Sequence, residues 1–418
     1  MARQTTSTVC GKSLFRLQHL LELFCLVCSL TLSLNAEILP CFTGSLPTND
    51  PKFPQQIIQV CIPPMGWNGQ LVVYVHGFVA PQLPLALPVA ELGSIGGDAA
   101  LGALLQNGFA FATTSLSKNG YAIEQGARDI NSLVAYFKTL TAPGSLKKIY
   151  LIGGSEGGLL ATLLLEQLPE LYDGALVISA PLGGAPFQVK YLGDFRVVFD
   201  YFFPSVLRDE FKAFEVPPLA FLNWGDLNSG YVQQITAGLM ANPSRAAQLF
   251  KVTHVALDPQ DPVGSAGNAA LGLLFYSVWE TPDLVATAGG IPYDNRLTLY
   301  LAAINNIALN RGVERVQSDP VARAYLRRFY QPTGKLQRPL VSLHARLDPI
   351  VPFQHQLIYF GLASLAGSRH FLTIIPSNRY GHGNFEIGEV LSAFGLLVQQ
   401  STGKLPNLQP VISSLAKR

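Results

Sequence analysis

Charged side chains are scarce in this chain of 418 residues. They make up 13% of the sequence, against about 25% in an average soluble domain, while 49% of the residues are hydrophobic. The 29 basic and 27 acidic residues nearly cancel. So small a basic excess predicts no nucleic-acid-binding face. The apolar content is high enough to form the core of one large folded unit.

Cysteine and histidine are also scarce, with five and seven residues. No C-x-x-C pair and no Cys/His spacing typical of a metal site occurs, so we expect neither a metal nor another cofactor. Only Cys41 and Cys61 follow the first 36 residues. In an oxidising compartment we expect them to pair, which would stabilise the fold by about 3 kcal/mol in the chain-entropy model. Two buried free thiols are the alternative.

The N-terminal segment has the composition of a targeting signal. Basic residues precede an apolar stretch from Leu20 to Leu34, and no acid occurs before Glu22. This pattern predicts a secretory signal peptide over residues 1–36, cleaved near Ala36, and a secreted or periplasmic protein. An uncleaved anchor is the alternative, although the apolar run is shorter than the ~20 residues that a membrane span needs. We expect no integral membrane span after cleavage.

Short apolar runs alternate with helical patterns along much of the chain. The runs are rich in β-branched and aromatic residues and cover 71–75, 109–116, 148–153, 175–180, 339–344 and 371–376. The clearest helical pattern has Ile130, Leu133, Val134 and Phe137 on one face. This alternation predicts an α/β fold, with a mainly parallel sheet covered by helices on both faces.

One long interval interrupts the alternation. Residues 186–337 contain helical patterns without an evident core strand, which predicts a helical cap inserted into a core formed by residues 37–185 and 338–418. Near its start, aromatic residues recur at every fourth position: Phe187, Tyr191, Phe195, Phe199 and Phe203. Such a stripe indicates packing, but part of it could face a substrate.

The motif "GGSEGG" follows the predicted strand at 148–153. G-x-S-x-G between a strand and a helix is typical of a nucleophile elbow, in which Ser155 sits at a tight, strained turn and neighbouring residues must lack side chains. The helix, expected to begin near Gly157, favours negative charge beside the serine. A structural serine in a glycine-rich turn is the alternative.

A nucleophilic serine needs a histidine base and an acid that orients it. His382 alone among the histidines lies in a loop just past the last predicted strand, in "SNRYGHGNF". Asp348 follows the preceding strand by four residues, so it could reach a histidine in the next loop. The chain order Ser, Asp, His supports this set. Asp348 could otherwise be a turn residue before proline.

The stretch that follows the run at 71–75 reads His76-Gly77-Phe78. Glycine there would let backbone amides point into the cleft, so we expect the N–H groups of Phe78 and Glu156 to form an oxyanion hole. His76 would orient this loop by hydrogen bonding, with Gly77 providing the room.

Together "LVVYVHGF", "GGSEGG", "LDPIVP" and "YGHGNF" resemble the α/β-hydrolase superfamily over about residues 56–186 and 338–400. The resemblance implies a mainly parallel sheet of roughly eight strands, an inserted cap and a Ser-His-Asp mechanism without a cofactor. It does not define the substrate, because esterases, lipases and peptidases share this fold.

On this basis we expect a secreted serine hydrolase that cleaves small-molecule carboxylic esters with a hydrophobic or aromatic group. The chain is similar to secreted esterases of the tannase and feruloyl esterase group, which typically have cysteines where Gly154 and Gly381 stand here. One alternative is a capped serine aminopeptidase that binds a substrate ammonium through cap acids. A catalytically silent binding protein on the same fold is another. The cap acids considered are Asp194, Asp200, Asp209, Glu210 and Glu215.

Overall fold

The computed structural model describes residues 41–63, 65–94 and 97–406. The signal peptide predicted over residues 1–36 lies outside the described residues. None of the helices in the described ranges has the length and apolar composition required to cross a membrane.

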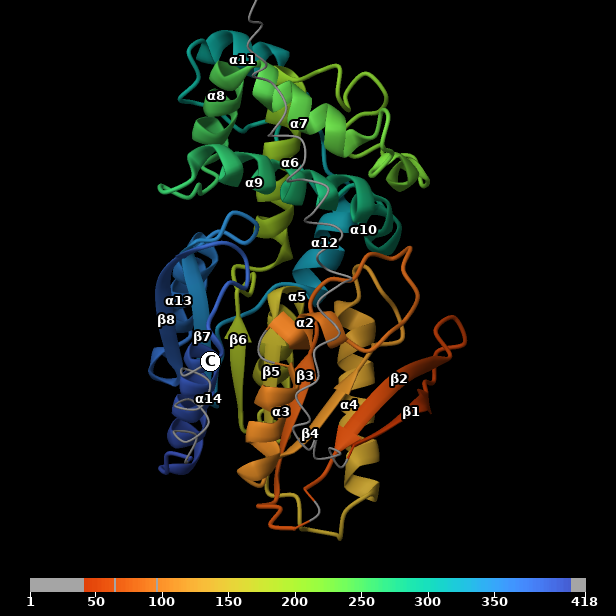
Figure 1. The fold of residues 1–418 in the computed structure, drawn as a ribbon, viewed down its shortest axis with the longest axis vertical. Coiled ribbons are helices and arrows are strands. Elements are labelled where there is room, and N and C mark those ends of the chain that lie inside the picture. The colour runs from red at the N-terminus through yellow and green to blue at the C-terminus, as the bar shows by residue number, and fades with distance from the viewer. Residues whose placement is uncertain (1–40, 64, 95–96, 407–418) are drawn as a thin grey trace, which may run out of the picture. The chain divides into compact units, whose positions relative to one another are not determined.

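Eight strands form one sheet in the order β1-β2-β4-β3-β5-β6-β7-β8 (Figure 1). The β1–β2 and β2–β4 pairs are antiparallel, and the other neighbouring strands are parallel. The predicted mainly parallel α/β sheet is therefore confirmed. The strands are β1 Cys41–Pro47, β2 Gln55–Cys61, β3 Gln70–Val75, β4 Ala110–Thr114, β5 Lys148–Gly154, β6 Gly174–Ile178, β7 Leu340–Leu347 and β8 Leu372–Tyr380.

Strands β1 and β2 were not among the six predicted runs. Their sequences, CFTGSLP and QQIIQVC, contain polar residues, a glycine and a proline, because they form the antiparallel edge of the sheet and β1 is largely exposed. Cys41 lies opposite Cys61 in this pair. The two form the disulfide proposed from the sequence.

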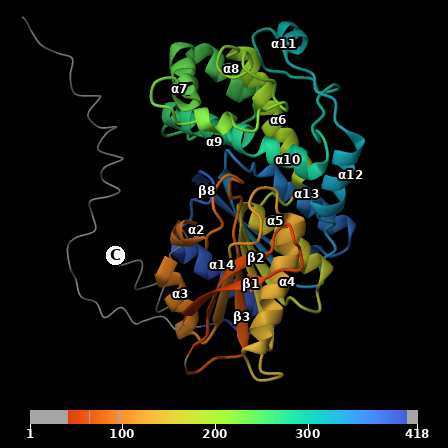
Figure 2. The ribbon, with the colours of Figure 1, turned by 90° about the vertical axis from the view of Figure 1, so that its right-hand side faces the viewer.

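Helices cover both faces of the sheet (Figure 2). On α4, Ile130, Leu133, Val134 and Phe137 are buried, as their spacing predicted. Burying each such side chain contributes about 1.5–3 kcal/mol, which holds the amphipathic helix against the strands. One face carries α2 Val89–Ser94, α3 Gly97–Gln106 and α14 Ile387–Thr402, and the other carries α4 Ile123–Thr139, α5 Ser155–Gln167 and α13 Gln354–Leu365.

Between β6 and β7 the described chain contains helices and loops but no strand. These helices lie beyond the carboxyl ends of the parallel strands (Figure 1), where ligands bind in open α/β sheets. They are α6 Ala185–Phe202, η1 Ala220–Asn223, α7 Tyr231–Ala241, α8 Pro243–Thr253, α9 Pro262–Trp279, α10 Thr281–Ala288, α11 Asn306–Gly312 and α12 Pro320–Phe329. We refer to residues 185–329 as the helical insertion.

The aromatic stripe of α6 packs inside the protein. Phe195, Phe199 and Phe203 are at most 4% exposed and contact one another ring to ring. Phe187 packs against the ring of His355. The Tyr191 hydroxyl donates a hydrogen bond to the carbonyl of Pro349. The packing interpretation of this stripe therefore holds, and a different face of α6, with Gln188 and Leu192, lines the pocket beside Ser155.

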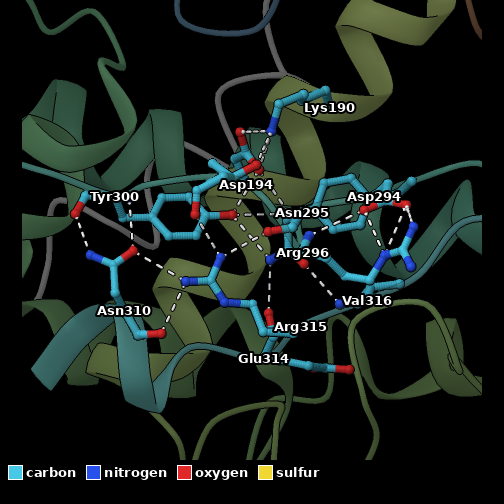
Figure 3. Close-up of polar contacts among 12 residues, drawn as sticks. Lys190, Asp194, Asp294, Asn295, Arg296, Tyr300, Asn310, Glu314, Arg315 and Val316 are labelled. Atoms are coloured by element: carbon cyan, nitrogen blue, oxygen red, sulfur yellow. Dashed lines mark hydrogen bonds and ion pairs between the residues drawn. The ribbon is translucent and has the colours of Figure 1, made fainter. Parts of the chain in front are cut away.

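A polar network joins α6 to the segment that follows α10 (Figure 3). Asp194 Oδ1 accepts hydrogen bonds from the hydroxyls of Tyr293 and Tyr300, each at 2.8 Å, and the same carboxylate pairs with Lys190. Arg315 donates to the carbonyl of Asn295 in the same cluster. These side chains hold the segment between α10 and α12, which includes α11, against α6, so they organise the insertion.

Candidate active site

Ser155 begins α5 directly after β5, two residues earlier than the predicted helix start. Its φ of 51° lies in the left-handed region, which non-glycine residues rarely adopt. Strain of this kind costs about 1–3 kcal/mol and persists only where the surroundings enforce it. The turn places Ser155 at the carboxyl edge of the sheet, at the N-terminus of a helix.

The flanking glycines explain how such a sharp turn fits. A Cβ on Gly157 would lie 2.1 Å from the carbonyl oxygen of Val75, and a Cβ on Gly153 would lie 2.4 Å from that of Gly157. Both distances are far shorter than any real contact, so a side chain at either position would force β3, β5 and α5 apart.

Asp348 and His382 form a direct pair. His382 Nδ1 donates to Asp348 Oδ2 at 2.8 Å, while Asp348 Oδ1 accepts the N–H groups of Ile350 and Val351, each at 2.9 Å. Asp348 is 1% exposed. The carboxylate is therefore held by two backbone donors and fixes the histidine tautomer that has its free electron pair on Nε2.

The position of Asp348 differs in one respect from the prediction. We expected the strand to end at His344, four positions before this aspartate, but β7 continues to Leu347 and Asp348 follows at once. The pairing of β7 with β8 extends through Ala345 to Leu347, with an irregularity between them. Such bulges redirect a strand end and are frequent beside active sites.

The pKa of His382 reflects two opposing effects. Burial lowers it, but the charge of the Asp348 carboxylate and its hydrogen bond outweigh burial, with a further contribution from the charge of Glu91, so the pKa lies above its usual value of 6.5. Since the imidazolium is stabilised in this way, His382 is suited to accept a proton and release it again.

Two other histidines lie near this pair but are buried and neutral. His344 Nε2 donates to the carbonyl of Val351, and its Nδ1 accepts from Gln356. His355 Nδ1 accepts the N–H of Gly183. Burial lowers the pKa of both imidazoles. They support the loops after β7 and β6 and, being neutral, leave His382 as the histidine poised to change charge here.

The loop after β3 lies against the nucleophile. A Cβ on Gly77 would come within 3.1 Å of the Ser155 Cβ. His76 is buried, and its Nδ1 hydrogen-bonds the carbonyl of Gly77. The backbone N–H groups of Phe78 and Glu156 donate to no other described residue. Both amides are therefore available to a ligand beside Ser155.

Glu91 is a part of this site that the sequence analysis missed. Its two carboxylate oxygens accept the Gly77 N–H at 3.0 and 2.9 Å, and Oε1 also accepts the Tyr74 hydroxyl. By accepting the Gly77 N–H, Glu91 holds the His76–Gly77 peptide, which lies one peptide before the Phe78 amide. No motif marks this residue, because it reaches the site from the short helix α2.

Ser155 lines a pocket between the core and the helical insertion. Phe78, Tyr121, Tyr276 and Tyr330 supply aromatic surface, and the described residues of its wall include two acids, Glu156 and Glu280. None of the five cap acids named from the sequence lines it; Asp194 and Asp200, for example, are paired with Lys190 and Arg196. The remaining wall consists of Leu159, Pro181, Ala185, Gln188, Leu192, Ile350 and Val351.

The chain has an α/β-hydrolase fold. The features that define it are the strand order, the antiparallel β2, the strained serine after β5, and the acid and histidine after β7 and β8. No protein-family model matches the chain, and no curated protein sequence matches it.

One solved structure with a similar fold is lipase A from Candida antarctica in its closed state. It is 16% identical to this chain, the alignment covers 90% of this chain and 85% of the lipase, and the TM-score is 0.49. Feruloyl esterase B from Aspergillus oryzae is 15% identical over 88% of this chain and 81% of its own, with a TM-score of 0.48. An acylaminoacyl peptidase from Pyrococcus horikoshii is 10% identical over 90% of this chain and 45% of its own, with a TM-score of 0.43.

Proposed function

We propose that the protein is a secreted serine hydrolase that cleaves carboxylic esters, with Ser155 as nucleophile, His382 as general base and Asp348 as the orienting acid. The observation that carries this proposal is the Asp348–His382 pair, at 2.8 Å, on the same sheet edge as a serine held at φ 51°. A serine hydroxyl group is activated as a nucleophile by a histidine base that a third residue orients.

In the proposed mechanism, His382 Nε2 takes the proton of Ser155 Oγ as Oγ attacks the ester carbonyl carbon. The N–H groups of Phe78 and Glu156 stabilise the negative charge on the carbonyl oxygen. As the tetrahedral intermediate collapses, His382 gives its proton to the departing alcohol, leaving an acyl-enzyme. Water then attacks in the same way, and the freed acid leaves Ser155 with its proton restored.

Residues 186–337 would act as the cap over this site, on a core of residues 37–185 and 338–418. The pocket wall supports this, since Leu192 and Tyr276 of the insertion lie opposite Ser155 and Leu159 of the core. The Cys41–Cys61 disulfide supports an oxidising compartment, in line with the predicted signal peptide. The apolar and aromatic wall favours a hydrophobic or aromatic group in the ester.

The test is Ser155→Ala, assayed with a panel of 4-nitrophenyl esters. We expect kcat to fall by about 10⁶ while the fold is retained, which is the usual effect of removing a catalytic serine. A fluorophosphonate probe should label the wild-type protein at Ser155 and leave the variant unlabelled. Near-normal turnover by the folded variant would overturn the assignment, and a wild-type protein that the probe does not label would indicate a silent binding protein.

A serine aminopeptidase on the same fold is the second candidate. The two carboxyl groups of Glu156 and Glu280 on the pocket wall favour it, because an ammonium group needs such partners. Aminoacyl anilides assayed beside the esters distinguish the two bond types.

A further inference from the structure

Two carboxyl groups face the same small cavity as the proposed nucleophile. Glu156 follows Ser155 on α5, and Glu280 lies between α9 and α10 of the helical insertion. They are more than a hundred residues apart in sequence but line one cavity with Ser155. Glu280 is buried and Glu156 is half-buried. Acids taken out of water in this way are rare unless they are paired or serve a ligand, so this pair requires an explanation.

Neither carboxyl group has a cationic partner among the described residues. Glu156 Oε1 is buried and accepts no hydrogen bond there. Glu280 is 7% exposed and accepts a hydrogen bond from the Tyr121 hydroxyl. Within the part of the chain that the structure describes, no ion pair includes either residue.

The nearest basic groups are already engaged by other acids. Lys118 Nζ lies 3.2 Å from Asp283 and also donates to Thr287 and to the carbonyl of Tyr121. Arg196, which shares an adjoining cavity with Glu280, is held by Asp200 at 2.9 Å. Neither Glu156 nor Glu280 therefore has a salt-bridge partner among the described residues.

The pKa values of both carboxyl groups are raised, as expected for acids without a salt-bridge partner. Burial, together with the charge of Asp283, raises the pKa of Glu156 to about 8 against smaller opposing effects from the Ala122 amide and Lys118. Burial and the charge of Glu156 raise the pKa of Glu280 well above its usual value. Each group would ionise far more readily if a cation entered the cavity.

The rest of the wall suits a positive charge as well. Phe78, Tyr121, Tyr276 and Tyr330 surround the two acids, and aromatic faces attract ammonium groups. The cavity volume is about 50 Å³, which holds a few water molecules and hence a substituent of a few heavy atoms.

We propose that Glu156 and Glu280 bind an ammonium group of the substrate, so that the preferred substrates are esters or amides carrying a positive charge a short distance from the scissile carbonyl. This inference rests on the proposed function of Ser155, and it replaces a purely hydrophobic substrate with one that is cationic at this position.

The test compares matched substrates that differ only in charge. On the acyl side, 4-nitrophenyl esters of 3-aminopropanoate and 6-aminohexanoate are paired with those of butanoate and heptanoate. On the alcohol side, a choline ester is paired with its 3,3-dimethylbutyl isostere. We expect the cationic member of at least one pair to have a kcat/KM about 10- to 100-fold higher, the range for a hydrogen bond to a charged group.

Glu280→Gln should reduce this preference at least tenfold, measured as the ratio of kcat/KM within the pair. Asp209→Asn is the matched control, because it removes one negative charge from an exposed position of the same insertion and should leave the ratio unchanged. The wild-type comparison alone decides the matter if Glu280→Gln does not fold.

The possible failures are distinguishable. Equal or faster hydrolysis of the neutral member in every pair overturns the ammonium site and leaves the serine hydrolase standing. If a fluorophosphonate labels Ser155 but none of these esters is hydrolysed, the ammonium site is likewise overturned and the serine hydrolase stands. Absence of both hydrolysis and labelling overturns the proposed function, and the ammonium site with it.

Discussion

Replacement of Asp348 by asparagine is expected to disable the enzyme without unfolding it. In the wild-type protein, Oδ1 accepts two backbone N–H groups and Oδ2 accepts His382 Nδ1. The asparagine side chain has one oxygen in place of the two carboxylate oxygens. If that oxygen stays with the Ile350 and Val351 amides, its NH₂ group must face His382.

The opposite orientation is disfavoured by its cost. It would turn the NH₂ group toward two backbone donors and leave both unsatisfied, at about 1–3 kcal/mol each. In the preferred orientation, donor faces donor at Nδ1, so the imidazole moves its proton to Nε2. A histidine with a proton on Nε2 cannot accept one from Ser155. We therefore expect kcat to fall by about 10⁴, equivalent to about 5.4 kcal/mol in the activation barrier.

The assay is steady-state hydrolysis of a 4-nitrophenyl ester, with circular dichroism and thermal unfolding to establish the fold of each variant. Asp194→Asn is the matched control, since Asp194 organises the insertion through Lys190, Tyr293 and Tyr300. Asp194→Asn should lower kcat much less than Asp348→Asn does. The reasoning fails if folded Asp348→Asn retains more than a tenth of wild-type kcat, or if Asp194→Asn is the more impaired variant.

Three further outcomes are expected. Since Asp348 raises the pKa of His382, kcat/KM for a neutral ester should fall as the pH drops through a value above 6.5, and a flat profile between pH 5 and 9 would argue against His382 as the base. Burial lowers the pKa of His355 in the folded state, so the unfolded chain binds more protons than the folded chain below pH 6.5. The free energy of unfolding should therefore fall as the pH decreases. His355→Asn should reduce the slope of unfolding free energy against pH by up to about 1.4 kcal/mol per pH unit. Urea unfolding at pH 5.5 and 7.5 measures both slopes, and equal slopes in the two proteins would exclude the effect. Intact mass of exported protein should show a mature N-terminus near Glu37 and a Cys41–Cys61 bond, whereas two free thiols or retained residues 1–36 would contradict the secreted interpretation.

Features coded by neighbouring residues could be predicted from the sequence. The parallel strands are short apolar runs, so their order along the chain was evident before the structure. Ser155, Asp348 and His382 could be proposed because each follows such a run, and strand ends meet at one edge of the sheet. The glycines around Ser155 mark a local steric requirement, which the 2.1 Å approach at Gly157 makes explicit.

Features that depend on distant contacts could not be predicted. Both the aromatic stripe of α6 and its neighbouring face are largely apolar, so periodicity could not decide which face turns to the pocket. Glu91 and Glu280 carry no motif, and their roles depend on where α2 and the α9–α10 junction pack. The acids named from the sequence were acids of the predicted cap, and several of them form ion pairs within the insertion instead.

The disulfide at the edge of the sheet also bears on how the protein would respond to a protease. The turn that joins β1 to β2 contains Lys52, which is exposed and offers trypsin a cleavage site between the two bonded cysteines. A cut after Lys52 would not release β1, because Cys41 remains attached to Cys61 and the two strands remain paired along their length. Nicked protein would therefore migrate as one chain under non-reducing conditions and lose its N-terminal fragment only when reduced.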